Sequence, residues 1–149
     1  MTTNSIRHVL LIEDNPDERE LFQLAFDQIN IPHEISVAED GQQAIDYLFG
    51  KGEFAGQDTL HKPDIIFLDL KLPKLSGFEV LKLIRSNPEA TYIPIVIFTS
   101  SNIKADMVTG YKLGANSIIT KPVNGERFME CINHMGEYWL MWNYPPPTE

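Results

Sequence analysis

The sequence predicts an α/β protein with a doubly wound sheet of five parallel strands in the order 2-1-3-4-5, arranged in three α/β/α layers. Two observations support this fold class. Short apolar runs alternate with amphipathic stretches along the chain, and some of these runs are apolar at nearly every position. Such runs are typical of parallel strands that are buried on both faces. Their strict alternation with helices indicates a sheet covered by helices on both sides, and this strand order is common for five such strands.

Each element predicted in the first half of the chain has a local signal. The apolar run within 8–14 indicates the first strand. Asn15 is placed to cap the helix that follows, expected over 16–29, which has a proline at its first position. Residues 34–38 alternate polar and apolar side chains, as in an edge strand. An apolar stripe over 41–49 predicts the second helix.

The second half of the chain continues the alternation. Ser76 and Glu79 have the spacing of a capping box at the start of a helix, and Gly114 is placed to cap the end of another. Apolar runs bounded by polar residues indicate the remaining strands. The expected strands are 63–70, 93–99 and 117–120, and the expected helices are 76–87, 102–113 and 124–142.

The chain of 149 residues suits one domain with a well-buried core. We find no internal repeat and no second domain, so residues 1–149 are expected to form a single unit. Residues 1–6 are expected to be a flexible N-terminus. The glycine-containing stretch 50–62 is expected to be a long solvated loop, and residues 137–149 a C-terminal extension.

Composition excludes several classes of function. The net charge of −9, from 21 acidic and 12 basic residues, argues against nucleic acid as a partner, because phosphate binding requires a basic face. No run reaches the ~18 apolar residues of a membrane span, and residues 1–7 lack the apolar segment of a signal peptide. The single cysteine, Cys131, cannot form an internal disulfide. We therefore expect a cytoplasmic protein that does not bind membranes.

Three carboxylates lie at the ends of two of the predicted strands, directly after their apolar runs. Glu13 and Asp14 follow the first apolar run, and Asp69 follows the third strand's run. In the expected strand order these two strands flank the point where open α/β sheets bind ligands. Close carboxylates repel one another by ~4 kcal/mol per pair at moderate screening. A divalent cation relieves this repulsion, and Mg²⁺ prefers oxygen ligands, so the sequence predicts a Mg²⁺ site here.

Two further polar residues are expected at the same edge of the sheet. Thr99 ends the fourth strand, and Lys121 follows the fifth. Together with the carboxylates they suit phosphoryl transfer, in which charge on three phosphoryl oxygens must be stabilised. Mg²⁺, Lys121 and Thr99 would each contact one oxygen, and Asp69 would be the nucleophile that forms an acyl phosphate. No residue here is a strong candidate for a general base, so a stored phosphoryl group is favoured over rapid turnover.

At these residues the chain resembles the receiver domain of two-component response regulators. The resemblance covers residues 6–135, and its elements occur in the family's order, each beside a predicted strand or helix. Any one of them is weak, but the ordered set is specific. The matching elements are Glu13-Asp14, Asp69 within the segment LDLKLP, Gly77, Thr99-Ser100 and Lys121-Pro122.

The resemblance implies a flavodoxin-like receiver fold and a phosphoacceptor signalling protein, not an enzyme with turnover. Asp69 is expected to accept a phosphoryl group from a sensor histidine kinase and to lose it slowly. The Lys121–Pro122 peptide bond is expected to be cis. The implied Mg²⁺ ligands are Glu13, Asp14, Asp69 and the backbone carbonyl of Lys71, and the residues implied to sense the phosphoryl group are Thr99 and Lys121.

Three positions depart from the family pattern. Ile118 stands where the family often has an aromatic ring that rotates on activation. Ser100 is polar where the family often has alanine. Lys71 lies two residues after the nucleophile, where side chains tend to tune the lifetime of the phosphoryl group.

The last predicted helix has an apolar stripe with a heptad-like spacing from Phe128 to Trp142. Its first part is expected to pack on the sheet. Past Glu137 the helix is expected to overrun the domain, and exposed aromatic residues in such a run usually mark an interface. With this tail the chain resembles the small regulators paired with bacterial phytochromes, which tend to dimerise through this end. The predicted homodimer contacts are Phe128, Tyr138, Trp139 and Trp142.

The expected partners are a sensor histidine kinase, of the phytochrome type, and a phosphotransfer protein, because the sequence carries no output domain. Two other functions stay open at this point. One is a phosphatase of the haloacid dehalogenase type, which usually has a second acid where this chain has Lys71. The other is a degenerate receiver that only binds a partner, against which the retention of Asp69, Thr99 and Lys121 argues.

Overall fold

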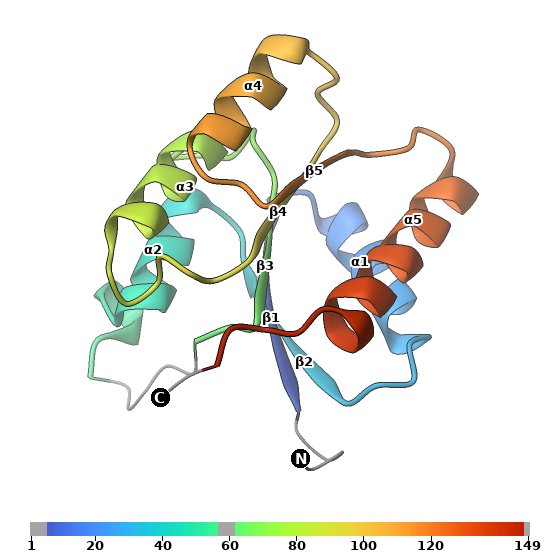
Figure 1. The fold of residues 1–149 in the computed structure, drawn as a ribbon, viewed down its shortest axis with the longest axis horizontal. Helices are drawn as coiled ribbons and strands as arrows, with labels where there is room; N and C mark the ends of the chain where they lie inside the picture. The colour runs from blue at the N-terminus through green and yellow to red at the C-terminus, as the bar shows by residue number, and fades with distance from the viewer. Residues whose placement is uncertain (1–5, 57–61, 148–149) are drawn as a thin grey trace.

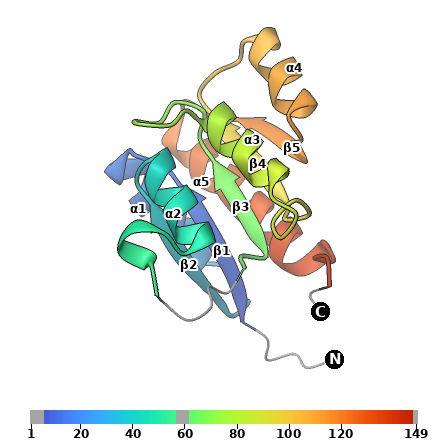
Figure 2. The ribbon, with the colours of Figure 1, turned by 90° about the vertical axis from the view of Figure 1, so that its left-hand side faces the viewer.

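The structure is a computed structural model, and it describes residues 6–56 and 62–147. Within these residues, five parallel strands form one sheet in the order β2-β1-β3-β4-β5. Helices cover both faces of the sheet (Figure 1, Figure 2). The predicted fold class and strand order are therefore confirmed. The strands are β1 (Arg7–Ile12), β2 (His33–Ala38), β3 (Ile65–Leu68), β4 (Ile95–Thr99) and β5 (Ser117–Thr120).

The helices form the two outer layers. Helices α1 and α5 lie together on one side of the sheet, and α2, α3 and α4 lie on the other side (Figure 1). A short 3₁₀ turn, Gly52–Phe54, follows α2. Residues 1–5 of the expected flexible N-terminus lie outside the described residues, and so does part of the expected loop 50–62. The helices are α1 (Pro16–Asp27), α2 (Gly41–Phe49), α3 (Gly77–Ser86), α4 (Lys104–Lys112) and α5 (Gly125–Glu137).

The predicted helix caps are confirmed. The Asn15 side chain accepts hydrogen bonds from the backbone N–H groups of the first turn of α1. Ser76 and Glu79 form a reciprocal capping box at the start of α3. Gly114 follows α4 with a φ of 110°, a left-handed conformation that favours glycine. The first two caps fix the starts of α1 and α3, the helices that come after β1 and β3 along the chain.

The core consists of two apolar layers, one on each face of the sheet. Strands β1, β3 and β4 bury almost all of their residues because each face has a covering layer of helices. Alternate residues of one strand therefore enter different layers. Phe67 of β3, for example, packs with Phe22 and Phe26 of α1, whereas Ile66 and Leu68 face the layer that contains α2 and α3.

The C-terminal segment differs from its prediction. Helix α5 ends at Glu137, and Tyr138–Trp142 form a π-helical turn, η2, in which the Asn143 N–H donates to the Tyr138 carbonyl at 2.6 Å. Leu140 is buried in the core layer of α1 and α5, and Trp139 packs against it. The expectation that the helix overruns the domain is therefore wrong, because the wider turn directs these side chains back onto the sheet. The chain then crosses from the side of α5 toward the side of α2 (Figure 1).

Candidate functional site

The carboxyl ends of four strands bring the predicted site residues together. Ile12 of β1 stands opposite Leu68 of β3, so Glu13 and Asp69 are the next residues of two paired strands. The Asp69 N–H donates to the Ile12 carbonyl at 3.1 Å, which continues the ladder by one residue. At the ends of the next two strands, β4 and β5, the Lys121 N–H donates to the Thr99 carbonyl at 2.7 Å. Strand register therefore places these side chains at one edge.

The three carboxylates form a compact cluster. Glu13, Asp14 and Asp69 each offer an oxygen atom, and these atoms lie within 4.8 Å of one another. Glu13 and Asp69 are buried, whereas Asp14 is exposed. Lys71 lines the same open depression. Three hard oxygen donors with an excess of negative charge fit Mg²⁺ better than a softer transition metal. The juxtaposition expected from the sequence is thus present.

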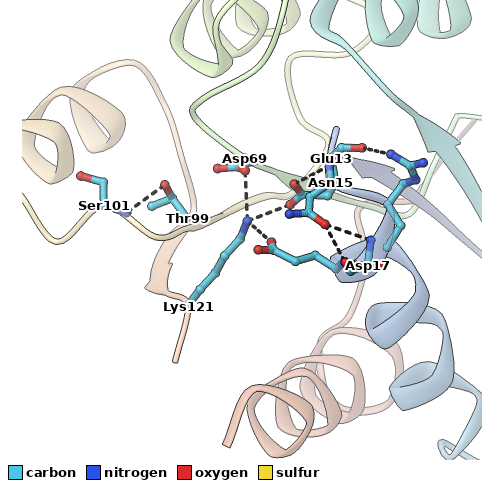
Figure 3. Close-up of polar contacts among 9 residues, drawn as sticks. Glu13, Asn15, Asp17, Asp69, Thr99, Ser101 and Lys121 are labelled. Carbon is cyan, nitrogen blue, oxygen red and sulfur yellow. Dashed lines mark hydrogen bonds and ion pairs between the residues drawn. The ribbon is translucent and has the colours of Figure 1, made fainter. Parts of the chain in front are cut away.

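Lys121 is the buried cation of this site, and it contacts three acids (Figure 3). Its Nζ lies 2.8 Å from Glu13 Oε1, 3.0 Å from Asp69 Oδ2 and 2.5 Å from Glu18 Oε1. The Lys121 side chain is only 6% exposed, and its Nζ lies 5.7 Å from the centre of the Phe98 ring. The amine is therefore held in place by both charge and packing.

Burial and charge act in opposite directions on the two buried partners Glu13 and Lys121. Burial raises the pKa of Glu13 to about 7, the hydrogen bond and charge of Lys121 oppose this shift, and the charge of Asp69 adds to it. For Lys121, burial alone lowers the pKa, but the hydrogen bonds from its amine to Glu13 and Glu18 and the nearby negative charges outweigh it. The pKa of Lys121 therefore lies above its usual value. Lys121 therefore stays charged at neutral pH, whereas the pKa of Glu13 lies near neutral pH.

The sequence reasoning missed Glu18 as a member of the site. Glu18 lies in the first turn of α1. Helical side chains point back toward the N-terminus of their helix, and α1 starts at the edge where β1 ends. This direction is the signal by which Glu18 could have been found.

Thr99 makes a contact that the sequence did not predict. Its hydroxyl accepts a hydrogen bond from the Ser101 N–H at 3.2 Å (Figure 3). The Ser101 hydroxyl donates to Asp106 Oδ2 of α4 at 2.7 Å. Thr99 is 1% exposed, and its own hydroxyl proton is left for another acceptor. Ser100 lines the depression that contains the carboxylates.

One family-derived expectation concerns the peptide bond that follows Lys121, at the end of β5. The described part of the chain has no cis peptide bond, so the Lys121–Pro122 bond is trans and the expected cis bond is wrong. The trans form of such bonds is favoured by about 0.5–1 kcal/mol. Ile118, which departs from the family pattern, packs against the core layer of α2 and α3 beside Gly110 of α4.

The four predicted dimer contacts have different environments. Phe128 is buried in the core, with its ring centre 5.4 Å from that of Phe98, and offers no surface to a partner. Trp139 is half-buried. Tyr138 is 50% exposed and Trp142 is 71% exposed. Of the four, Tyr138 and Trp142 are therefore the exposed ones, and the Tyr138 ring also contacts that of Trp139.

None of the helices within residues 6–56 and 62–147 has the length and apolar character that crossing a membrane requires.

Comparisons with known sequences agree with this geometry. Residues 9–133 match the family described as response regulator receiver domain. The response regulator Rcp1 of Synechocystis sp. is 33% identical over 93% of this chain and 92% of its own length. The probable methanogenesis regulatory protein FilR2 of Methanothrix harundinacea is 35% identical over 93% of this chain and 86% of its own length.

Solved structures give the same result. The phosphorylated cyanobacterial phytochrome response regulator RcpA has a TM-score of 0.90 and 35% identity, covering 96% of this chain and all of the other. The Mn²⁺-bound form of Rcp1 has a TM-score of 0.89 and 32% identity, covering 95% of this chain and 99% of the other.

Proposed function

Because the chain belongs to the family of response regulator receiver domains, we propose that it accepts a phosphoryl group on Asp69 in a Mg²⁺-dependent reaction. The observation that carries this proposal is the contact of a buried ammonium, Lys121, with a buried carboxylate, Asp69, inside a cluster of three acids. Glu13, Asp14, Asp69 and the Lys71 carbonyl would hold the Mg²⁺. When bound, Mg²⁺ supplies positive charge against the phosphoryl oxygens.

In the proposed reaction, a carboxylate oxygen of Asp69 attacks the phosphorus of a phosphohistidine on the sensor kinase. The new O–P bond forms as the P–N bond breaks, and the electron pair of the P–N bond leaves with the imidazole nitrogen. Lys121 lies 3.0 Å from the Asp69 carboxylate, within reach of one phosphoryl oxygen. The Thr99 hydroxyl, which accepts from Ser101, still has a proton to donate to another. The residues thus position and neutralise the transferred group.

The direct test is chemical labelling. Wild-type protein incubated with acetyl phosphate and Mg²⁺ is expected to shift on a phosphate-affinity gel, and Asp69→Asn is expected to remove the shift. Asp17→Asn is a matched control, because Asp17 lines the same depression and is not one of the three clustered carboxylates. Equal labelling of wild type and Asp69→Asn contradicts the assignment of the acceptor.

We also propose that the donor is a histidine kinase of the phytochrome type. Support comes from the similarity to RcpA, which is itself described as a phytochrome response regulator. Under equal concentrations, phosphoryl transfer from an autophosphorylated phytochrome kinase is expected to be at least ~10-fold faster than transfer from an unrelated kinase, a difference of about 1.4 kcal/mol in activation free energy. Equal rates would contradict the pairing. A phosphotransfer protein could take the group onward, and it can be tested as an acceptor in the same assay.

A homodimer through the C-terminal segment is a further proposal. Tyr138 and Trp142 support it, because two large aromatic side chains are exposed within one short turn. The double variant Tyr138→Ser with Trp142→Ser leaves the buried Leu140 in place, so the fold is expected to persist. Sedimentation velocity is expected to show a shift from dimer toward monomer. A wild-type monomer, or an unchanged dimer in the variant, removes this proposal.

A further inference from the structure

Lys121 has one acidic partner more than phosphoryl transfer requires. Its contacts with Asp69 and Glu13 join it to the acceptor and to a proposed metal ligand. The third contact, with Glu18, is the shortest of the three at 2.5 Å. Glu18 is not a member of the clustered carboxylates that could hold a metal within the described residues. Its role is therefore not accounted for by the site described above.

The position of Glu18 is fixed from the start of α1. Its N–H donates to Asn15 Oδ1 at 3.1 Å, and the Asn15 N–H donates to Glu13 Oε2 at 3.2 Å. From this anchored turn the Glu18 side chain reaches Lys121, which follows β5. Since β3 and β4 lie between β1 and β5 in the sheet, this contact spans the width of the site, as the contact between Lys121 and Glu13 also does.

The three acids around Lys121 differ in their freedom to leave it. An ammonium group has three protons to donate, and the three carboxylates occupy all of them at 2.5–3.0 Å. A phosphoryl oxygen on Asp69 needs one of these donors, so one carboxylate must yield its place. The side chains of Glu13 and Asp69 are 6% and 10% exposed, whereas that of Glu18 is 30% exposed. Of the two acids that keep a free carboxylate when Asp69 is modified, only Glu18 can turn into water without leaving a charge buried and unpaired.

From this difference we propose that Glu18 is a positioning residue that holds Lys121 beside Asp69 in the unmodified protein and competes with the phosphoryl group for that lysine. The proposal rests on the proposed function of Asp69. It predicts that the Glu18 carboxylate weakens retention of the phosphoryl group, since the group gains its contact with Lys121 only by displacing a negative charge. Removal of that charge strengthens retention.

The experiment measures the dissociation constant of beryllium fluoride, a phosphoryl mimic, on the full chain at saturating Mg²⁺. Glu18→Gln is expected to bind the mimic about three- to tenfold more tightly than wild type, the range of a partly buried ion pair. Asp17→Asn removes one charge from the same helical turn without a contact to Lys121, and is expected to change binding less than ~twofold. Asp17 is exposed and Glu18 is partly exposed, so both variants are expected to keep the fold. Urea unfolding of each variant checks this.

A double-mutant cycle separates the contact from a general charge effect. In a Lys121→Gln background, Glu18→Gln is expected to change mimic binding less than ~twofold, because the group being competed for is gone. Equal binding by Glu18→Gln and Asp17→Asn, or an undiminished effect of Glu18→Gln without Lys121, overturns the inference. Failure of wild type to bind the mimic, or equal binding by Asp69→Asn, instead overturns the proposed function and this inference with it.

Discussion

Lys121→Met is expected to lower the free energy of unfolding by about 3 kcal/mol at pH 8 without Mg²⁺, because it leaves buried carboxylates without their partner. Lys121 contacts Glu13, Glu18 and Asp69, and two of these acids are buried. Equilibrium urea unfolding measures the loss. Lys82→Met is the matched control, since Lys82 lies exposed on α3, and it is expected to change stability by less than ~0.5 kcal/mol.

Two conditions are expected to relieve the loss in Lys121→Met. Mg²⁺ should restore most of it, because a cation that binds only the folded state stabilises that state by mass action. Acid should relieve it as well. The folded-state pKa of Glu13 is already raised to about 7 from 4.5, and loss of Lys121 removes the contacts that oppose this shift. A group with a raised folded-state pKa stabilises the fold at low pH and loses that contribution as the pH rises. The loss of unfolding free energy in Lys121→Met should therefore be smaller at about pH 5.5 than at pH 8. An equal loss at the two pH values, and with or without Mg²⁺, would contradict this description of the site.

Gly77→Ala is expected to destabilise the fold by about 3 kcal/mol and to slow phosphoryl labelling of Asp69. A Cβ atom at residue 77 would lie 2.3 Å from the Asp69 carbonyl oxygen and 2.6 Å from the Leu70 Cα. Both are backbone atoms, so the clash cannot be relieved by a side-chain rotation. The Gly77 N–H also donates to the Leu70 carbonyl at 2.8 Å, which holds the start of α3 against the acceptor loop. The added methyl group would move Asp69 itself.

Gly125→Ala is the matched control for this prediction. Gly125 also occupies the first position of a helix, α5, but an added Cβ meets no atom within 4 Å. Its stability is expected to stay within ~0.5 kcal/mol of wild type, with unchanged labelling by acetyl phosphate. If Gly77→Ala behaves like Gly125→Ala in both assays, the close packing of α3 against the acceptor loop does not position Asp69.

The sequence was sufficient to predict the fold and the acidic cluster, for a specific physical reason. Apolar runs such as 9–12 and 65–68 are typical of parallel strands that are buried on both faces. The strand order that is common for five such strands makes these two neighbours. Once they pair in register, the next residues, Glu13 and Asp69, meet at the carboxyl edge without further information. Thr99 and Lys121 follow by the same rule from β4 and β5.

The parts that were not predicted depend on side-chain reach and on turn geometry, which strand ends do not determine. Glu18 joins the site because a long side chain crosses it from α1. Ser101 contacts Thr99 because the chain turns sharply between β4 and α4. The π-helical turn after Glu137 redirects Trp139 and Leu140 onto the core, and a heptad-like spacing alone cannot distinguish that turn from a continuing α-helix.

The central claim is that residue 69 carries the phosphoryl group, and locating the modification on the chain tests it most directly. Protein treated with acetyl phosphate and Mg²⁺ is reduced with borohydride, which converts an aspartyl phosphate to homoserine, and its peptides are sequenced by mass spectrometry. We predict homoserine at position 69 alone, and none when EDTA removes the metal. Homoserine at a different acid, or at position 69 in equal yield with EDTA, would contradict the account.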